Sequence, residues 1–372
     1  MITLKEMISK KEMKAFVKFP FKLYKDNPYW VPPIINDEID SFDKTINPVF
    51  KHADARFFVA LKNNEIVGRV AAIINHTEIN EQKLKKMRFG WFDFIDDIEV
   101  SKMLLGKVEE IGSQNKLEFM EGPMGFSNLD KVGVLTEGFD HIGTMITWYN
   151  HPYYKDHLKK LCFLKEKEYV ESKFAFKNVD AEPLKRVNKV IKDRYGLRSL
   201  NFTKTKDIFP YVNQMFDLFN ESYASLPSFV PISDIEKEYF KKKYINFINP
   251  EYIKFVFDKD DNMIAFAIIM PSFSTALQKA KGKLLPFGMF HLLKAKKNSK
   301  DVILYLIGIH PKFQNKGIHA VLFHEYKISC ELNNIKDCIR TPELASNAAI
   351  AAIWKKFDSV TIKTRCTFKK VI

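Results

Sequence analysis

The stretch IGIHPKFQNKGIHA, which spans residues 307–320, decides the fold of the second half of this chain. It completes an apolar run that begins at Val302 and stops at Pro311. A short polar loop and Gly317 come next, and apolar residues then recur at helical spacing. The stretch therefore predicts a strand over 302–309, a glycine turn, and a helix that runs from Gly317 to Leu332.

The turn between this strand and this helix has the composition of an anion-binding site. The N-terminus of a helix presents free backbone N–H groups and the positive end of its dipole, which together attract phosphate. Gly317 allows the backbone to approach a ligand closely, and Lys316 adds a positive charge at the same place. The turn thus predicts a site for a phosphorylated ligand.

The same segment resembles the GNAT acyltransferases, whose signature is an apolar strand, V-x-P, and then [QR]-x-x-G-x-[GA] at the start of a helix. The residues that match it at the right spacing are Ile309, Pro311, Gln314 and Gly317. As in that family, the motif begins on the strand that follows a hairpin. Asn347 begins a later helix, as the corresponding asparagine of the family does. The resemblance covers residues 199–372.

The resemblance implies an N-acyltransferase that uses acetyl-CoA, or another acyl-CoA, in the second half of the chain. A deprotonated amine would attack the thioester directly, and a strand amide would meet the developing oxyanion. Backbone groups of the strand would bind the pantetheine arm, and amides of the turn the pyrophosphate. The implied cofactor-binding residues are Ile307, Gly308, Ile309, Gln314, Asn315, Lys316, Gly317, Ile318, His319 and Asn347.

Two positions depart from the family pattern. His319 replaces a small residue, so its side chain would either crowd the pyrophosphate or, when protonated, pair with it. Trp354 stands where the family often has a tyrosine that acts as general acid. The strand carries no carboxylate to act as a base, and its only protic side chain, Tyr305, is a catalytic candidate against the alternative of core or wall packing. The resemblance adds Asn347 as a second candidate, which would contact the pantetheine or the acyl end.

The order of predicted elements occurs twice along the chain. The first half reads as a hairpin over 57–74, strands at 91–95 and 117–120 around a helix over 98–111, a helix at 152–161 and a strand at 163–170. The second half reads as a hairpin over 252–270, the strand and helix above, a strand at 336–339, a helix from Asn347 and a strand at 360–368. We therefore expect an α/β fold of two GNAT-like domains, at 1–178 and 179–372. Each would be a mixed, mostly antiparallel twisted sheet flanked by helices, and the charged stretch 178–198 would link them as a helix.

The first half lacks the phosphate turn. Asp96, Asp97 and Glu99 stand between its strand and its helix, where a phosphate would need amides and positive charge. We expect this half to have lost CoA binding and to serve the fold or the acceptor site. Its glycine-rich segment 122–143 holds five of the 14 glycines, and long ordered loops are often functional. The acceptor-binding candidates on it are Asn128, Glu137 and Asp140, against the alternative of a loop packed by its apolar residues.

Lysine and arginine exceed aspartate and glutamate by 59 to 45, so the net charge is +14 and favours acidic partners. Half of this excess lies in residues 271–300, which hold seven lysines and no acid. The segment predicts either a solvated basic lid over the cleft or a peripheral contact with an anionic membrane, because lysines alternate with bulky apolar residues. The expected partner is a small-molecule or lipid-linked amine acceptor, with nucleic acid less favoured.

Other features bound the class of protein. The four cysteines show no CxxC pairing, which predicts neither a metal site nor a disulfide framework. The longest apolar run is too short to span a bilayer, and we expect a cytoplasmic protein. Two alternatives to the acyltransferase stay open. One is a Fem-type transferase that uses aminoacyl-tRNA on two similar domains, and the other is a non-catalytic protein that binds CoA or lipid on the same scaffold.

Overall fold

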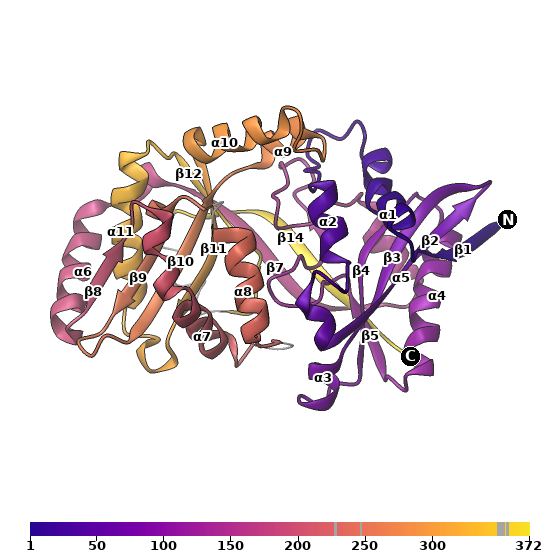
Figure 1. Ribbon diagram of the computed structural model, residues 1–372, viewed down its shortest axis with the longest axis horizontal. Helices are drawn as coiled ribbons and strands as arrows, with labels where there is room; N and C mark the ends of the chain where they lie inside the picture. The colour runs from indigo at the N-terminus through magenta and orange to yellow at the C-terminus, as the bar shows by residue number, and fades with distance from the viewer. Residues whose placement is uncertain (227–228, 246–247, 348–353, 355–356) are drawn as a thin grey trace.

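The computed structural model describes residues 1–226, 229–245, 248–347, 354 and 357–372 (Figure 1). Within this part of the chain the strands form one fourteen-stranded mixed sheet. Its main path runs β1-β2-β3-β4-β5-β14-β7-β12-β11-β10-β9-β8, with β6 paired to β14 and β13 to β7. The predicted α/β class with mixed sheets is confirmed. None of the described helices is long and apolar enough to cross a bilayer.

The first half of the chain contributes one end of the sheet and five helices. Its strands are β1 Ile2–Glu6, β2 Ala53–Lys62, β3 Glu65–Asn75, β4 Lys86–Phe94, β5 Phe119–Gly122, β6 Val134–Glu137 and β7 Leu164–Ala175. Its helices are α1 Lys10–Leu23, α2 Ile35–Ser41, α3 His76–Asn80, α4 Ile98–Gln114 and α5 Tyr153–Lys160. The predicted hairpin is present, and Asn63 and Asn64 take positive φ angles of 53° and 62° in its turn.

The second half contributes the other end of the sheet. Its strands are β8 Arg198–Asn201, β9 Ile253–Phe257, β10 Met263–Pro271, β11 Asp301–Ile309, β12 Asp337–Arg340, β13 Glu343–Leu344 and β14 Val360–Val371. Its helices are α6 Ala181–Tyr195, α7 Val212–Tyr223, α8 Asp234–Tyr244, α9 Ser274–Ala280, α10 Gly288–Asn298 and α11 Ile318–Leu332. The predicted strand over 302–309 and helix over 317–332 are confirmed as β11 and α11. Most of the helix predicted from Asn347 lies outside the described residues.

Each half is built in three layers, because helices cover both faces of the sheet. In the first half, α4 packs on one face and α1 and α2 on the other. Gly68 on β3 lets α4 approach, since an added Cβ would lie 2.8 Å from side-chain atoms of Val100 and Leu104. In the second half, α6 and α11 cover one face and α7 and α8 the other.

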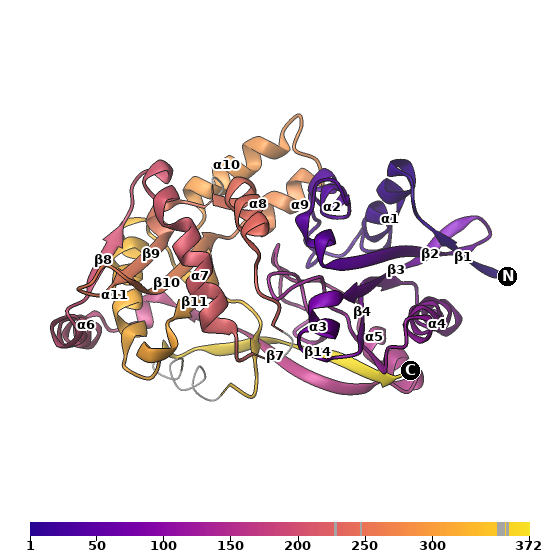
Figure 2. The ribbon, with the colours of Figure 1, turned by 60° about the horizontal axis from the view of Figure 1, so that its bottom comes forward.

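The two halves exchange strands (Figures 1 and 2). The last strand of the chain, β14, inserts between β5 and β7, and Phe368 on it belongs to the core of the first half. Strand β7 runs the other way, pairs with β12, and places Phe174 in the core of the second half. The predicted boundary at residues 178 and 179 comes directly after β7 in the sequence. The sheet, however, crosses from one half to the other through both exchanged strands.

Both halves also repeat one local irregularity. Strand β4 pairs in parallel with β5 only as far as Arg88, and β11 pairs in parallel with β12 only as far as Leu304. Each strand then bulges against its antiparallel neighbour and continues without the parallel partner. A wedge therefore opens beside the later part of β4 and of β11.

The strand exchange makes a prediction about stability. Phe368 is 2% exposed, so Phe368→Ala should lower the free energy of unfolding by about 3–5 kcal/mol in urea titrations. Hydrogen exchange in α4 and β5 should accelerate, although the substitution is near the C-terminus. Val371 is 74% exposed, and Val371→Ala should stay within about 0.5 kcal/mol of the original chain. Unchanged exchange in the first half would contradict the pairing.

Candidate functional site

The turn between β11 and α11 has the backbone of an anion-binding loop. Gly317 is the N-cap of α11 with φ 81°, and Asn315 precedes it with φ 60°. An added Cβ at Gly317 would lie 3.1 Å from Ile191 on α6, so both conformation and space favour glycine. Gly317 has no side chain that could cap the first turn of α11, and the Ala320 N–H donates to the Gly317 carbonyl at 2.9 Å.

Positive charge is held beside this turn. The ammonium group of Lys316 lies 5.6 Å from the ring centre of Tyr195 and 5.2 Å from that of Phe313. These rings restrict the side chain through cation–π contacts while Lys316 stays exposed. His319, also predicted in the turn, is half-buried with its ring 6.4 Å from that of Phe323.

The wedge beside β11 exposes backbone groups that a sheet normally satisfies. His310 donates its backbone N–H to Ile264 on β10 at 2.9 Å. By strand alternation, Ile307 and Ile309 turn their backbone groups to the open edge. There the carbonyl of Ile307 accepts a hydrogen bond from the Tyr223 hydroxyl at 3.0 Å, and that of Ile309 accepts one from Gln314 Nε2 at 3.1 Å. The amides of the same two residues face this edge too.

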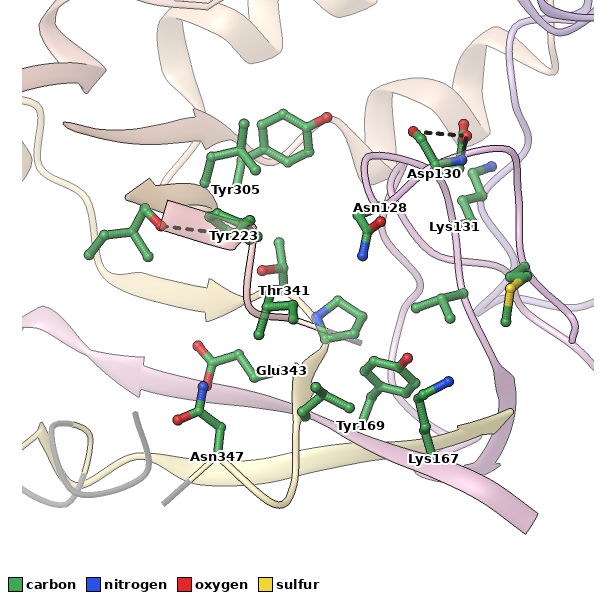
Figure 3. A pocket seen from close by; sticks show the side chains of 18 of the residues that line it. Asn128, Asp130, Lys131, Lys167, Tyr169, Tyr223, Tyr305, Thr341, Glu343 and Asn347 are labelled. Atoms are coloured by element: carbon green, nitrogen blue, oxygen red, sulfur yellow. Dashed lines mark hydrogen bonds between the residues drawn. The ribbon is translucent and has the colours of Figure 1, made fainter. Parts of the chain in front are cut away.

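The wedge leads into a cavity of about 200 Å³ between the two halves (Figure 3). The second half lines it with Tyr223, Leu226, residues 304–307 and 341–344, and Asn347. The first half lines it with Arg88, Met124, residues 127–128 and 130–132, Lys167 and Tyr169. The cavity therefore needs both halves, and the strand exchange brings its walls together.

Glu343 is the carboxylate with the most altered chemistry in this cavity. It lies on β13, whose pairing with β7 sets Glu343 opposite Val170. Burial raises the pKa of Glu343 to about 7, which outweighs the opposing effects of Arg340 at 3.4 Å and of the Trp354 indole N–H at 3.2 Å. A carboxyl group that titrates near neutrality can exchange protons with a ligand in the cavity.

Arg340 and Trp354 hold Glu343 in place. The Arg340 guanidinium lies 4.4 Å from the Trp354 ring and donates a hydrogen bond to Ser172 at 2.9 Å. Trp354, which departs from the family pattern, thus donates a hydrogen bond to Glu343. The sequence alone did not indicate Glu343 as a site residue. Glu343 lacks a motif of its own, and only the three-dimensional pairing with β7 brings it to the cavity.

Both predicted catalytic candidates line the cavity. Tyr305 lies at the bulge of β11, and burial raises its pKa well above the ordinary value, so its hydroxyl stays protonated at neutral pH. Asn347 lines the opposite wall beside Glu343 (Figure 3). Tyr223, on α7, is an addition that the sequence did not indicate. Burial raises its pKa to about 12.

Of the three predicted acceptor-binding residues, the structure brings only Asn128 to the cavity. Its amide oxygen also accepts a hydrogen bond from the Val230 N–H at 3.3 Å. Glu137 is exposed at the end of β6 and accepts a hydrogen bond from Thr364. Asp140 is exposed in the following loop. Neither of these two is among the residues that line the cavity.

A buried ion network fixes the loop that carries Asn128. Arg88 makes two hydrogen bonds of 2.7 Å to Glu78 and donates to the carbonyls of Gly125 and Phe126 at 2.9 and 3.1 Å. Buried charges are stable only when paired in this way. The network therefore holds the loop against the sheet, and Asp130, whose pKa is raised by burial, faces the cavity from it.

The corresponding wedge beside β4 is filled by side chains. The Tyr154 hydroxyl accepts a hydrogen bond from the Phe94 N–H at 3.1 Å, and the Tyr153 hydroxyl donates to the Phe94 carbonyl at 2.6 Å. The rings of Phe94 and Tyr154 stack at 4.2 Å. Two tyrosines of α5 thus occupy the place that is open beside β11.

The helix after β4 is also closed to anions. Asp97 caps α4 by accepting a hydrogen bond from the Glu99 N–H at 3.1 Å, and it pairs with Lys62 at 3.0 Å. A carboxylate already satisfies the positive end of this helix. The equivalent position of α11 is Gly317.

A smaller pocket opens from the same wall of the cavity. It shares Asp130, Tyr305 and Leu306 with the cavity and has a volume of about 50 Å³. Its other lining residues are Leu129, Met215, Phe216, Phe240, Tyr244, Ile245, Ile248 and Ile268. We call it the apolar side pocket, because most of its lining side chains are aliphatic or aromatic; Asp130, Tyr244 and Tyr305 also bring polar atoms to it.

The chain is similar in sequence to two bacterial proteins over most of its length. Protein YghO of Escherichia coli K12 is 24% identical over 322 residues, 86% of this chain and 81% of that protein. The bacterial ceramide synthase of Caulobacter vibrioides is 25% identical over 313 residues, 82% of this chain and 79% of that protein. No family model matches.

Among solved structures, a tandem GNAT protein from the clavulanic acid biosynthesis pathway superposes over 100% of this chain and 98% of its own. The TM-score is 0.58 and the sequence identity 8%. The chain therefore has the fold of a tandem GNAT protein, as the turn at Gly317 and the repeated order of elements predicted.

Proposed function

We propose that this protein is an acyl-CoA-dependent N-acyltransferase with one active site, in the cavity between its halves. The observation that carries the proposal is the continuity of three features. An anion-binding turn at Gly317 leads to the open edge of β11, and this edge leads to a cavity in which the pKa of Glu343 is about 7. The tandem GNAT fold and the ceramide synthase relative support the same class of reaction.

The residues around the wedge fit CoA. The amides from Gln314 to His319 and the ammonium of Lys316 would bind the pyrophosphate. The amides of Ile307 and Ile309 would donate hydrogen bonds to the pantetheine arm, which would lie along the open edge of β11 in the place of a neighbouring strand. When bound, CoA supplies an acyl group activated as a thioester. The first half offers no such site, because Asp97 and the tyrosines of α5 occupy its equivalent.

The remaining chemistry is assigned to residues of the cavity. Glu343, whose pKa is about 7, would accept a proton in its ionised form from the acceptor ammonium and leave a nucleophilic amine. A backbone N–H of β11 would donate to the oxyanion that develops on the acyl carbon. Tyr305 keeps its proton at neutral pH and would donate a hydrogen bond to the departing sulfur, which takes up the second proton that the nitrogen loses as the amide forms.

The apolar side pocket indicates an acyl group longer than acetyl. It opens beside Tyr305, where the acyl carbon would lie, and most of its lining side chains are apolar. The name of the Caulobacter relative, a ceramide synthase, indicates a product in which a fatty acyl group is joined to a long-chain amine. We therefore propose a hydrocarbon-chain donor and a lipid-like amine acceptor.

The cofactor site is tested by calorimetric titration with a non-reactive acyl-CoA analogue. One equivalent should bind per chain. Gly317→Glu should weaken binding by roughly tenfold or more, because it places a carboxylate among charge-assisted hydrogen bonds worth about 1.5–3 kcal/mol each. Gly106→Glu is the matched control, since Gly106 faces open space on α4. Absence of binding, or equal effects of both substitutions, would refute the site.

The base is tested by the pH dependence of kcat/KM. Because Glu343 acts when deprotonated and its pKa is about 7, kcat/KM should rise as the pH increases through 7. Glu343→Gln should lower kcat by about 10²–10⁴-fold and remove this rise. Glu137→Gln, outside the cavity, should leave the profile unchanged. A rise that persists in Glu343→Gln would assign the base elsewhere.

The chain preference is tested with a series of acyl-CoA donors. Each added methylene buried in the side pocket should raise kcat/KM by roughly threefold to fourfold, from a transfer energy of about 0.8 kcal/mol. Leu129→Trp should narrow the pocket and shorten the optimal chain, whereas Leu129→Met should not. Equal kcat/KM for acetyl and longer donors would contradict a chain site here.

A further inference from the structure

Four bulky apolar side chains are exposed together around the start of α10. Leu285, Phe287, Phe290 and Leu293 are 78%, 71%, 64% and 58% exposed. Single exposed apolar residues are ordinary on a protein surface, but here four lie within nine residues, and a spacing of three makes Phe287 a neighbour of Phe290 and Phe290 a neighbour of Leu293. We call these four residues the α10 patch.

Positive charge surrounds the α10 patch. Residues 271–300 contain seven lysines and no acid. Six of these lysines are exposed and form no ion pair with any residue that the structure describes; they are Lys279, Lys281, Lys283, Lys294, Lys297 and Lys300. Elsewhere many surface lysines pair with carboxylates, as Lys22 does with Glu65 at 2.7 Å. The surface around α10 is therefore strongly positive as well as apolar.

The opposite face of this segment is already used for packing. Leu292 on α10 and Leu277 on α9 join a small core with Val31 and Ile34 of the first half. Figures 1 and 2 both show α10 at the outer edge of the molecule, with α9 reaching toward the first half. The α10 patch thus points away from the packed side of a segment that is fixed to both halves.

We propose that the α10 patch docks the protein on the surface of an anionic lipid bilayer. Phenylalanine and leucine side chains would enter the interfacial region, and the lysines would lie among anionic headgroups, as in interfacial amphipathic helices. Charge complementarity selects this occupant. A second copy of the chain would bring the same lysines face to face in a two-fold interface, where like charges repel.

The segment that carries the α10 patch is followed in the chain by a strand that lines the cavity. Only Ser299 and Lys300 separate α10 from β11, the strand that carries Tyr305. The docking itself does not depend on the proposed transfer reaction, since it is carried by surface residues outside the cavity.

Flotation with vesicles of phosphatidylcholine, alone or with phosphatidylglycerol, tests the docking on the full chain. The protein should float with the anionic vesicles and much less with the neutral ones, and added salt should release it. Phe287→Ser with Phe290→Ser should weaken binding by roughly tenfold or more. Lys294→Gln with Lys297→Gln and Lys300→Gln should weaken it by roughly a hundredfold.

Matched controls separate the patch from general effects. Leu332→Ser removes an apolar side chain that is 77% exposed on α11, and Lys10→Gln with Lys14→Gln and Lys18→Gln removes three exposed charges of α1. Both should bind vesicles like the original chain. Failure to float, equal flotation with neutral vesicles, or unchanged binding by the phenylalanine variant would overturn the proposal. So would retention on duplex DNA that the lysine variant loses while vesicle binding is unaffected.

Discussion

The pairing of β7 with β14 is the interaction on which the candidate site depends. It joins two sheets into one and holds β13 against β7, so that Glu343 stands opposite Val170. Backbone ladders alone do not hold this crossing, because Arg365 of β14 pairs with Glu171 of β7 where both are 1% exposed. Separation of the strands would leave unpaired charges in the core, which is strongly unfavourable. The cavity wall is therefore set by the same contacts that hold the halves together.

The two halves show how one backbone geometry is given different uses. Both β4 and β11 lose their parallel partner and bulge, so the wedge is a property of the fold and not of a ligand. Side chains decide whether each wedge is filled or open. Beside β4, the tyrosines of α5 satisfy the exposed backbone and Asp97 caps the next helix. Beside β11, Gly317 leaves the helix N-terminus open and Lys316 adds charge, which suits an anion.

The sequence predicted the features that depend on neighbours along the chain. The turn at Gly317, the hairpins and the helices α4 and α11 result from local periodicity, from residues that tolerate left-handed backbone and from a family signature of short range. Glu343 was not predicted, because it comes after an irregular turn and acquires its role from β7, which precedes it by more than 160 residues. Glu137 and Asp140 were chosen as polar residues of a glycine-rich loop. Composition does not show which side of that loop faces the other half of the chain. Of the three residues, only Asn128 lines the cavity between the halves.

Two buried glutamates illustrate how the structure separates stability from chemistry. Burial favours the neutral form of each, since water no longer stabilises the charge. At Glu78, two 2.7 Å hydrogen bonds from Arg88 and a 2.5 Å ion pair with Lys86 outweigh burial and lower the pKa.

At Glu343, the one arginine nearby lies 3.4 Å away and does not outweigh burial. The pKa of Glu343 therefore rises to about 7. Arg340 also contacts the Trp354 ring and donates a hydrogen bond to Ser172. Because its contacts are divided in this way, it compensates only part of the cost of burying the Glu343 charge. Incomplete pairing is what allows a buried carboxylate to take and release a proton near neutral pH. The upward shift therefore arises from burial, which the ion pair with Arg340 and the hydrogen bond from Trp354 do not offset.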